Sequence, residues 1–191
     1  MLNNPPMKLV SAVGGGKLSR ELDLEELSEH LDAYSVQYDL SSYHGIILRF
    51  EEDGPAVMIY RSGSFSISGA KSLDSLYDTY EQLVNALDSL LESFEYEEKF
   101  EVRNLVHQAT MDDRESINLN ALTIGLGLDS VEYEPEQFPG MLYRPNRDNH
   151  LFLIFATGKI VSTGFSEPET AEEEMIAVKD EIESIFSPTE M

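Results

Sequence analysis

The chain has 191 residues and no cysteine, so it can bury one substantial core or two small ones and has neither disulfide bonds nor thiolate metal sites. No apolar run approaches the ~18 residues that cross a membrane, and residues 1–7 lack the basic and apolar regions of a signal peptide, so we expect a cytoplasmic protein with no membrane partner. The net charge of −23 at pH 7 comes from 36 acidic and 13 basic residues spread over the whole chain, which favours a protein adapted to molar salt over an ordinary acidic protein that avoids nucleic acid.

The first half of the chain predicts a strand, a helix, four short strands and a long helix. The glycine-rich stretch GGGKLS, at 14–19, lies where the first strand connects to the first helix, and it lacks the Gly-Lys-Ser/Thr of a phosphate-binding loop. We expect the long helix over 72–94, because apolar side chains recur there on one face. That face contains Leu73, Leu76, Tyr80, Leu83, Leu87 and Leu90.

The second half predicts the same elements in the same order. Helices are expected at 116–128 and 166–186, and the second begins with capping-box spacing between Ser166 and Glu169. Its apolar stripe contains Met175, Val178, Ile182 and Ile185. Strands are expected at 99–110, 130–134, 140–145, 151–156 and 159–165. Hairpin strands with helices on one side predict an α+β fold.

The two halves are related by a shift of 95 residues. Matched pairs include Tyr38 and Tyr133, Gly45 and Gly140, and Arg49 and Arg144. We interpret the shift as one offset without a gap, which indicates a tandem duplication with repeats at 1–95 and 96–191. No linker rich in Pro, Gly or Ser separates the halves, so we expect one fused body with a single long sheet.

One face of the second sheet is predicted to stay uncovered. Alternation places Leu151, Leu153 and Phe155 on the same face, and after the turn at 157–158 this face continues with a cation, a valine and a threonine. Helices on one side of a sheet cannot cover this face as well. A large apolar face with a cation at its edge predicts a binding surface, with a dimer interface as the alternative.

Two segments of the second half resemble a known family. YEPEQFPGMLYRP, at 133–145, followed by LFLIFATGKIVSTG, at 151–164, is similar to the second repeat of the TATA-box-binding protein family of archaea and eukaryotes. The resemblance covers the whole chain as two repeats and is weaker in the first. It implies two pseudo-symmetric repeats in a saddle-shaped, mainly antiparallel ten-stranded curved sheet, with a concave DNA-binding face and four helices on the convex side.

The resemblance implies one pair of exposed rings per repeat. The family inserts two pairs of phenylalanines at base steps, which unstacks and bends the duplex and widens its minor groove. Phe138 and Phe155 match the second pair, and Tyr43 and Tyr60 match the first. Tyrosine hydroxyls need solvent or a hydrogen-bond partner, so we expect a weaker first kink.

The other implied DNA contacts lie mostly in the second repeat. Asn104 matches an asparagine that hydrogen-bonds base edges, and Arg144 and Lys159 match phosphate contacts. The implied contacts to the floor of the groove are Val106, Leu151, Leu153, Val161 and Thr163. In the first repeat Val10 and Arg49 persist.

The first repeat departs from the family at several of these positions. Lys8 stands where the first asparagine is expected, and Ser64 stands where a lysine is expected. A family arginine is replaced by Gly54 in the first repeat and by Asn149 in the second. The concave face of the first repeat then carries three serines, Ser64, Ser66 and Ser68. These departures predict a second repeat that is competent in DNA binding and a first that is eroded.

The acidic loop of the second repeat implies a protein partner. In the family, transcription factor B docks on the loop that contains the EPEQF segment, and here Glu134, Glu136 and Gln137 match it. The alternative is that these acids are only solvated loop residues in an acid-rich chain. The resemblance also implies the RNA polymerase pre-initiation complex as a partner and a monomer on DNA, and it leaves open a dimer of the free protein.

We therefore expect a TATA-box-binding initiation factor that bends promoter DNA and recruits transcription factor B. The alternative is a divergent paralogue that regulates through transcription factor B and binds DNA weakly or with altered preference. We expect no enzyme and no cofactor, because no nucleophile–base pair stands out and the histidines lack metal-ligand spacing. These histidines are His30, His44, His107 and His150.

Overall fold

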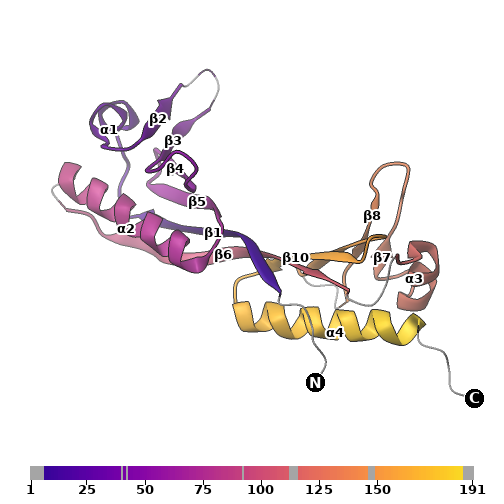
Figure 1. Ribbon diagram of the computed structural model, residues 1–191. Helices are drawn as coiled ribbons and strands as arrows, with labels where there is room; N and C mark the ends of the chain where they lie inside the picture. Colours follow the sequence, from indigo (N-terminus) through magenta and orange to yellow (C-terminus); the bar gives the residue numbers. More distant parts are fainter. Residues whose placement is uncertain are drawn as a thin grey trace, which may run out of the picture. The chain divides into compact units, whose positions relative to one another are not determined.

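The computed structural model describes residues 7–39, 41, 43–91, 93–111, 116–145 and 149–186. In this part of the chain, strand, helix, four strands and helix follow one another twice (Figure 1). The ten strands form one sheet in the order β2-β3-β4-β5-β1-β6-β10-β9-β8-β7. The expected α+β class, with ten strands and four helices, is confirmed.

The elements of the first half are β1 (Lys8–Leu18), α1 (Leu24–His30), β2 (Ser35–Tyr38), β3 (Gly45–Arg49), β4 (Ala56–Tyr60), β5 (Ser64–Ala70) and α2 (Leu73–Leu90). Those of the second half are β6 (Tyr96–Thr110), α3 (Leu119–Leu126), β7 (Val131–Glu132), β8 (Gly140–Tyr143), β9 (Leu151–Phe155), β10 (Lys159–Phe165) and α4 (Pro168–Phe186). None of the described helices is long and apolar enough to cross a membrane.

The chain divides into two compact units, which we name the N-unit (Ser11–Asn104) and the C-unit (Met1–Val10 with Leu105–Met191). Their boundaries fall inside β1 and β6, because the first part of β6 packs in the N-unit. There the ring of Phe100 stacks on that of Tyr80, with centroids 4.1 Å apart. The repeat boundary at 95–96 concerns the duplication of the sequence and stays a prediction.

Each unit packs a long helix against one face of its strands (Figure 1). In the N-unit, Leu76, Leu83 and Leu87 of α2 are buried against the sheet. In the C-unit, α4 buries Met175, Val178 and Ile182 of its predicted stripe, while Ile185 is half-buried. The N-unit helix ends four residues earlier than expected. The backbone after it is tied to the end of β1, since the amide of Ser19 donates to the carbonyl of Glu95 at 2.8 Å.

The two long helices begin differently. Ser72 caps α2, and its side chain accepts a hydrogen bond from the amide of Ser75 at 3.1 Å. The capping box predicted at Ser166 is wrong by one residue. Helix α4 begins at Pro168, and the carbonyl of Glu167 accepts the first helical bond, from Ala171. Proline favours the first helical position because its fixed φ suits a helix and it has no amide hydrogen to satisfy.

The offset between the repeats is 93, not 95, along the first strand of each. Gly15 pairs with Ser66 in the N-unit, whereas Gln108 pairs with Val161 at the equivalent place in the C-unit. The difference arises after these strands, since three residues separate Leu18 from Leu22 and five separate Met111 from Ile117. The interpretation of a repeat without a gap is therefore wrong for this segment.

This shift corrects two correspondences. By strand register, the N-unit equivalent of Asn104 is Ser11, and that of Val106 is Val13. Lys8 and Val10 therefore do not stand at the positions of the family asparagine and valine. Lys8 is exposed and Val10 is half-buried at the start of β1.

Candidate nucleic-acid interface

The strands of the C-unit carry an apolar face opposite their helix. Across β8, β9 and β10, Leu142 pairs with Leu153, and Leu153 pairs with Val161, all three half-buried. The alternate side chains, such as Phe152 and Ile154, are fully buried against the helix side. We call the half-buried side the open face. It also includes Leu151, Phe155, Thr163 and, on β6, Val106 and Gln108.

Two aromatic rings stand at the end of the open face of the C-unit. The ring centroids of Phe138 and Phe155 lie 5.8 Å apart, with the planes at 66°. Phe138 is 36% exposed and follows a tight turn, in which its amide donates to the carbonyl of Glu134 at 3.0 Å. Beneath the rings lies Gly140, where a Cβ atom would come within 2.7 Å of the ring of Phe138. The glycine is therefore a condition for this ring pair.

The N-unit carries an equivalent pair of tyrosines. The ring centroids of Tyr43 and Tyr60 lie 5.9 Å apart at 55°, and Gly45 lies beneath them as Gly140 does in the C-unit. The two hydroxyl groups share a hydrogen bond. This bond, together with burial, raises the pKa of Tyr43 to about 12. Each hydroxyl thus provides the partner that the other needs when the rings leave water.

The open face of the N-unit is less apolar than that of the C-unit. Ile47, Met58 and Ser66 pair in register across β3, β4 and β5, where the C-unit has Leu142, Leu153 and Val161. Ser68 is also half-buried, and the hydroxyl of Ser64 accepts from that of Ser62 at 3.2 Å. Of the three serines predicted on this face, only Ser66 replaces a hydrocarbon side chain, because the C-unit equivalents of Ser64 and Ser68 are Lys159 and Thr163.

The predicted phosphate contacts differ in their surroundings. Lys159 is exposed at the start of β10. The guanidinium of Arg144 lies 3.5 Å from the carboxylate of Glu132, and that of Arg49 donates to the carbonyl of Gly54. Arg49 thus bonds to the residue at which the sequence resemblance implies an arginine in family members, Gly54.

The acidic loop before β8 is fully at the surface. Glu134, Glu136 and Gln137 are exposed, and the side-chain amide of Gln137 donates to the carboxylate of Glu134. Asn104, the predicted base contact, is half-buried in β6 within the N-unit. The structure thus groups the predicted contacts of the C-unit on one face and one loop, while Asn104, Tyr43, Tyr60 and Arg49 belong to the other unit.

Comparison with known proteins identifies the family. A family model described as "Transcription factor TFIID (or TATA-binding protein, TBP)" matches residues 6–90 and 99–185. The chain belongs to the TATA-binding protein family. The two matched segments correspond to the two halves that share the strand and helix order.

Curated members of the TATA-binding protein family match nearly the whole chain. TATA-box-binding protein C of Halobacterium salinarum is 44% identical over 167 residues, which cover 87% of this chain and 91% of the relative. TATA-box-binding protein 1 of Haloferax volcanii is 36% identical over 166 residues, which cover 87% and 86%. The solved structure of Methanococcus jannaschii TBP matches with a TM-score of 0.75 at 29% identity, covering 94% of this chain and 99% of that one.

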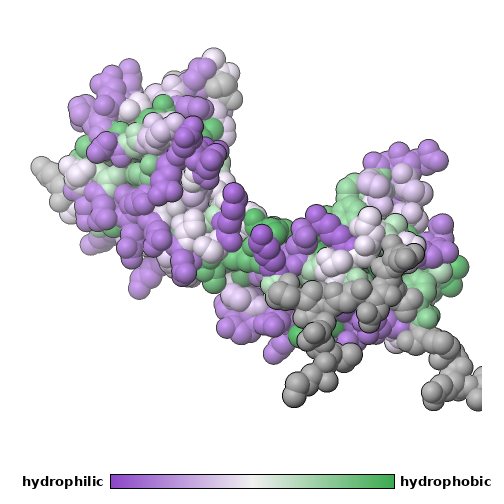
Figure 2. Space-filling view, viewed as in Figure 1, coloured by the Kyte–Doolittle hydropathy of each residue, from purple (hydrophilic) through white to green (hydrophobic). Residues whose placement is uncertain are grey.

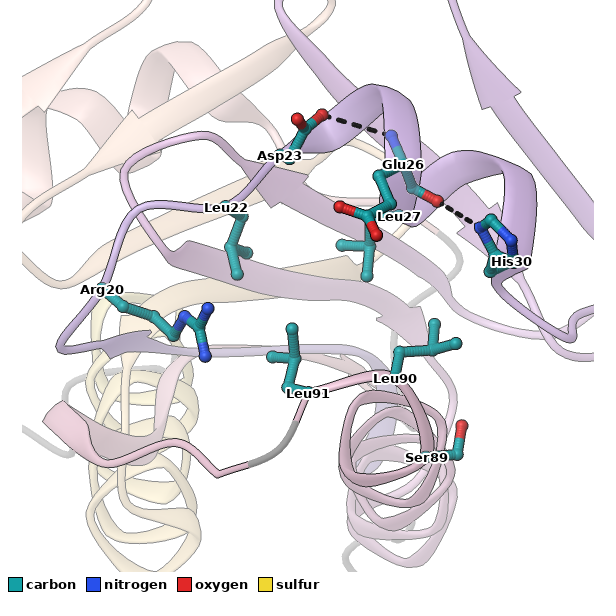
Figure 3. A pocket seen from close by; sticks show the side chains of 9 residues that line it. All are labelled: Arg20, Leu22, Asp23, Glu26, Leu27, His30, Ser89, Leu90 and Leu91. Atoms are coloured by element: carbon teal, nitrogen blue, oxygen red, sulfur yellow. Dashed lines mark hydrogen bonds between the residues drawn. The ribbon is translucent and has the colours of Figure 1, made fainter.

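One hollow of this TATA-binding protein family member lies on the helix side of the N-unit, between α1 and the end of α2 (Figure 3). It measures about 460 Å³, with Leu22, Leu27, Leu90 and Leu91 among its lining residues. Two of its polar side chains bond to the backbone of α1. Asp23 accepts from the amide of Glu26 at 3.2 Å, and His30 bonds to the carbonyl of Glu26 at 2.9 Å. At the equivalent place in the C-unit, Ile185 packs on Gly125.

Two site features were not predicted from the sequence. The hydrogen bond between the tyrosines and that between Arg49 and Gly54 join side chains to groups in neighbouring strands or loops. The shared spacing of the aromatic pairs, 17 residues in both repeats, was the available signal for the first. The sequence held no signal for the second.

Proposed function

We propose that this chain is a general transcription initiation factor that binds A·T-rich promoter DNA in the minor groove, bends it, and recruits transcription factor B. The main support is the aromatic pair set over a glycine at the end of the open face in each unit. Apolar side chains suit a groove floor with few hydrogen-bond donors, and ring wedges at base steps are the known mode of this family. Relatives named TATA-box-binding proteins add support.

The experiment is DNA bending measured by energy transfer on an end-labelled A·T-rich fragment in molar KCl. Phe138→Ala and Phe155→Ala should abolish bending, because each ring supports an unstacked step that costs a few kcal/mol. Ile124→Ala is the matched control, since Ile124 is 79% exposed on α3 and lies outside the open face. Normal bending by both phenylalanine variants would contradict the proposal.

The recruitment of transcription factor B rests on the acidic loop. Reversing Glu134 and Glu136 to Arg should leave binary DNA binding intact but weaken the ternary complex at least about tenfold, because like charges would meet in the interface. Lys159→Ala should do the opposite, weakening DNA binding without affecting the contact with transcription factor B. Anisotropy titrations with and without that factor, at one fixed high salt, measure both. Equal loss of both complexes in the double-Arg variant would leave the docking role without support.

A divergent paralogue is the second candidate, favoured by Ser64, Ser66 and the tyrosine pair in the N-unit. It regulates through transcription factor B and binds DNA weakly or with altered preference, so it predicts weak bending of an A·T-rich fragment by the chain alone and stronger bending when transcription factor B is added. Full bending of that fragment by the chain alone, with no preference for another sequence, contradicts it.

The proposal includes the assembly and its location. The chain acts as a monomer on DNA within the RNA polymerase pre-initiation complex, in the cytoplasmic compartment that holds the genome. Sedimentation of the free chain and of its DNA complex tests the stoichiometry, and two chains per DNA site would contradict it.

A further inference from the structure

Among the differences between the two open faces, one exchanges a polar side chain for an apolar one. Ser66 in the N-unit and Val161 in the C-unit occupy the same place in the same row of paired strands. Both are half-buried, with Met58 beside the serine and Leu153 beside the valine. One hydroxyl group in the N-unit therefore stands where the C-unit has the two methyl groups of a valine.

The neighbour of Ser66 on β1 is Gly15, so no side chain stands beside the serine on that strand. A Cβ atom added at Gly15 would lie 2.9 Å from the carbonyl oxygen of Phe65 and 3.8 Å from the Cβ of Ser66, so the glycine keeps this place free. In the C-unit the same place holds the long side chain of Gln108. Among the described residues, the Ser66 hydroxyl makes no hydrogen bond and so keeps its donor and acceptor for a ligand.

The minor groove distinguishes base pairs by one group. A·T and T·A pairs offer only acceptors, whereas a G·C pair adds the N2 amino donor of guanine at the floor of the groove. Val161 itself offers this donor no acceptor, and a donor that is buried without a partner is unfavourable. Against Ser66 it can donate to the hydroxyl oxygen, and over an A·T pair the same hydroxyl can donate instead.

We infer that Ser66 makes the N-unit tolerant of a G·C pair, so that the chain binds a hybrid site with a G·C-containing half under the N-unit and an A·T half under the C-unit. This inference rests on the proposed minor-groove binding. The hydroxyls of Tyr43 and Tyr60 bond to each other, so the base preference depends on the serine and not on the ring pair.

Orientation on DNA provides the test. The chain has no cysteine, so Ser41→Cys, exposed before the tyrosine pair, can carry a single DNA-cleaving label. The fragments are an all-A·T site and the same site with one G·C pair in either half. Cleavage should place the N-unit on the G·C half, with a preference of about tenfold, the range of one mismatched base pair.

Two reciprocal substitutions isolate the serine. Ser66→Val should remove the orientation and lower affinity for both G·C fragments, while Val161→Ser should let either unit accept the G·C half. The double variant should reverse the orientation. Ile124→Ala, on α3 and outside the open face, is the control and should leave orientation unchanged.

The outcomes separate this inference from the proposed function. Loss of binding and bending on the all-A·T fragment by the parent chain would overturn minor-groove binding itself. Normal bending of that fragment, with G·C fragments bound in both orientations by the parent chain, would overturn only the role of Ser66. An orientation that Ser66→Val does not change would do the same, provided that circular dichroism shows the variant to be folded.

Discussion

Single residues decide whether the ring pairs can form. Gly45 and Gly140 lie beneath them, and neither position has room for a Cβ atom. At Gly45 the nearest atom to an added Cβ is the carbonyl oxygen of Ile59, at 2.7 Å, which cannot swing away as a side chain can. The two glycines are thus needed for the ring pairs to adopt their positions, although neither glycine would contact DNA itself.

Gly140→Ala should displace the rings of Phe138 and Phe155 and reduce DNA bending to near the level of the free fragment. Overpacking of this kind also costs about 1–3 kcal/mol of folding stability. Energy-transfer bending and thermal melting measure the two effects. Gly54→Ala is the control, because a Cβ there would meet nothing closer than 3.2 Å, and a loss of bending in this variant would contradict the explanation.

We expect His107 to make the stability of the C-unit depend on pH. It is 4% exposed in β6, and burial lowers its pKa below the ordinary value, against the opposing effect of the Glu172 carboxylate. The unfolded chain, with a histidine pKa near 6.5, then binds more protons than the folded chain. The neutral histidine therefore costs no stability above about pH 7.5. As the pH falls below about 6.5, the unfolded chain takes up a proton that the folded chain does not, and the free energy of unfolding decreases.

Melting temperatures at pH 7.5 and 5.5 test this for the parent chain and for His107→Gln. We expect a smaller pH-dependent drop in the variant, since the carboxylates titrate in both proteins and cancel in the comparison. Equal drops would show that His107 does not contribute.

At the scale of the elements, the order of strands and helices was predictable, while the register of one strand was not. Strands and helices are predicted from the spacing of their apolar side chains, and this spacing is regular in β9, β10 and α2. β1 contains Gly14, Gly15 and Gly16, which carry no alternating pattern, so its register against the equivalent strand β6 could not be predicted from the sequence. The hydrogen bond between Tyr43 and Tyr60 depends on how the strands pair, so it could not be predicted from the sequence either.

The helix starts give a prediction at this scale. Ser72→Ala should cost about 1 kcal/mol of unfolding free energy, because the amide of Ser75 loses its capping oxygen. Ser166→Ala is the matched control and should be neutral, since Ser166 lies outside α4. Chemical denaturation measures both, and an equal loss in the two variants would restore the capping box that the sequence suggested.

At the scale of the molecule, charge opposes DNA binding. The net charge is −23, and hydrophilic side chains cover much of the visible surface of the N-unit over α1 and α2 (Figure 2). Several cations of that unit are paired with acids, including Lys17 with Glu97 at 2.7 Å and Arg103 with Glu98 at 2.9 Å. The apolar open faces and the ring pairs must therefore provide most of the affinity, and salt must screen the repulsion.

DNA binding should accordingly strengthen as KCl rises from about 0.1 M towards molar levels, the reverse of the usual slope from counterion release. Screening shortens the range of the repulsion to about 3 Å at 1 M, while burial of apolar surface does not weaken with salt. Affinity for an A·T-rich fragment across this range measures the slope. The melting temperature of the free chain at each KCl concentration shows whether an increase in affinity arises only because more of the chain is folded. A steep fall in affinity with salt, in a chain that stays folded throughout, would contradict adaptation to molar salt, because the few cations near phosphates would then outweigh the net charge.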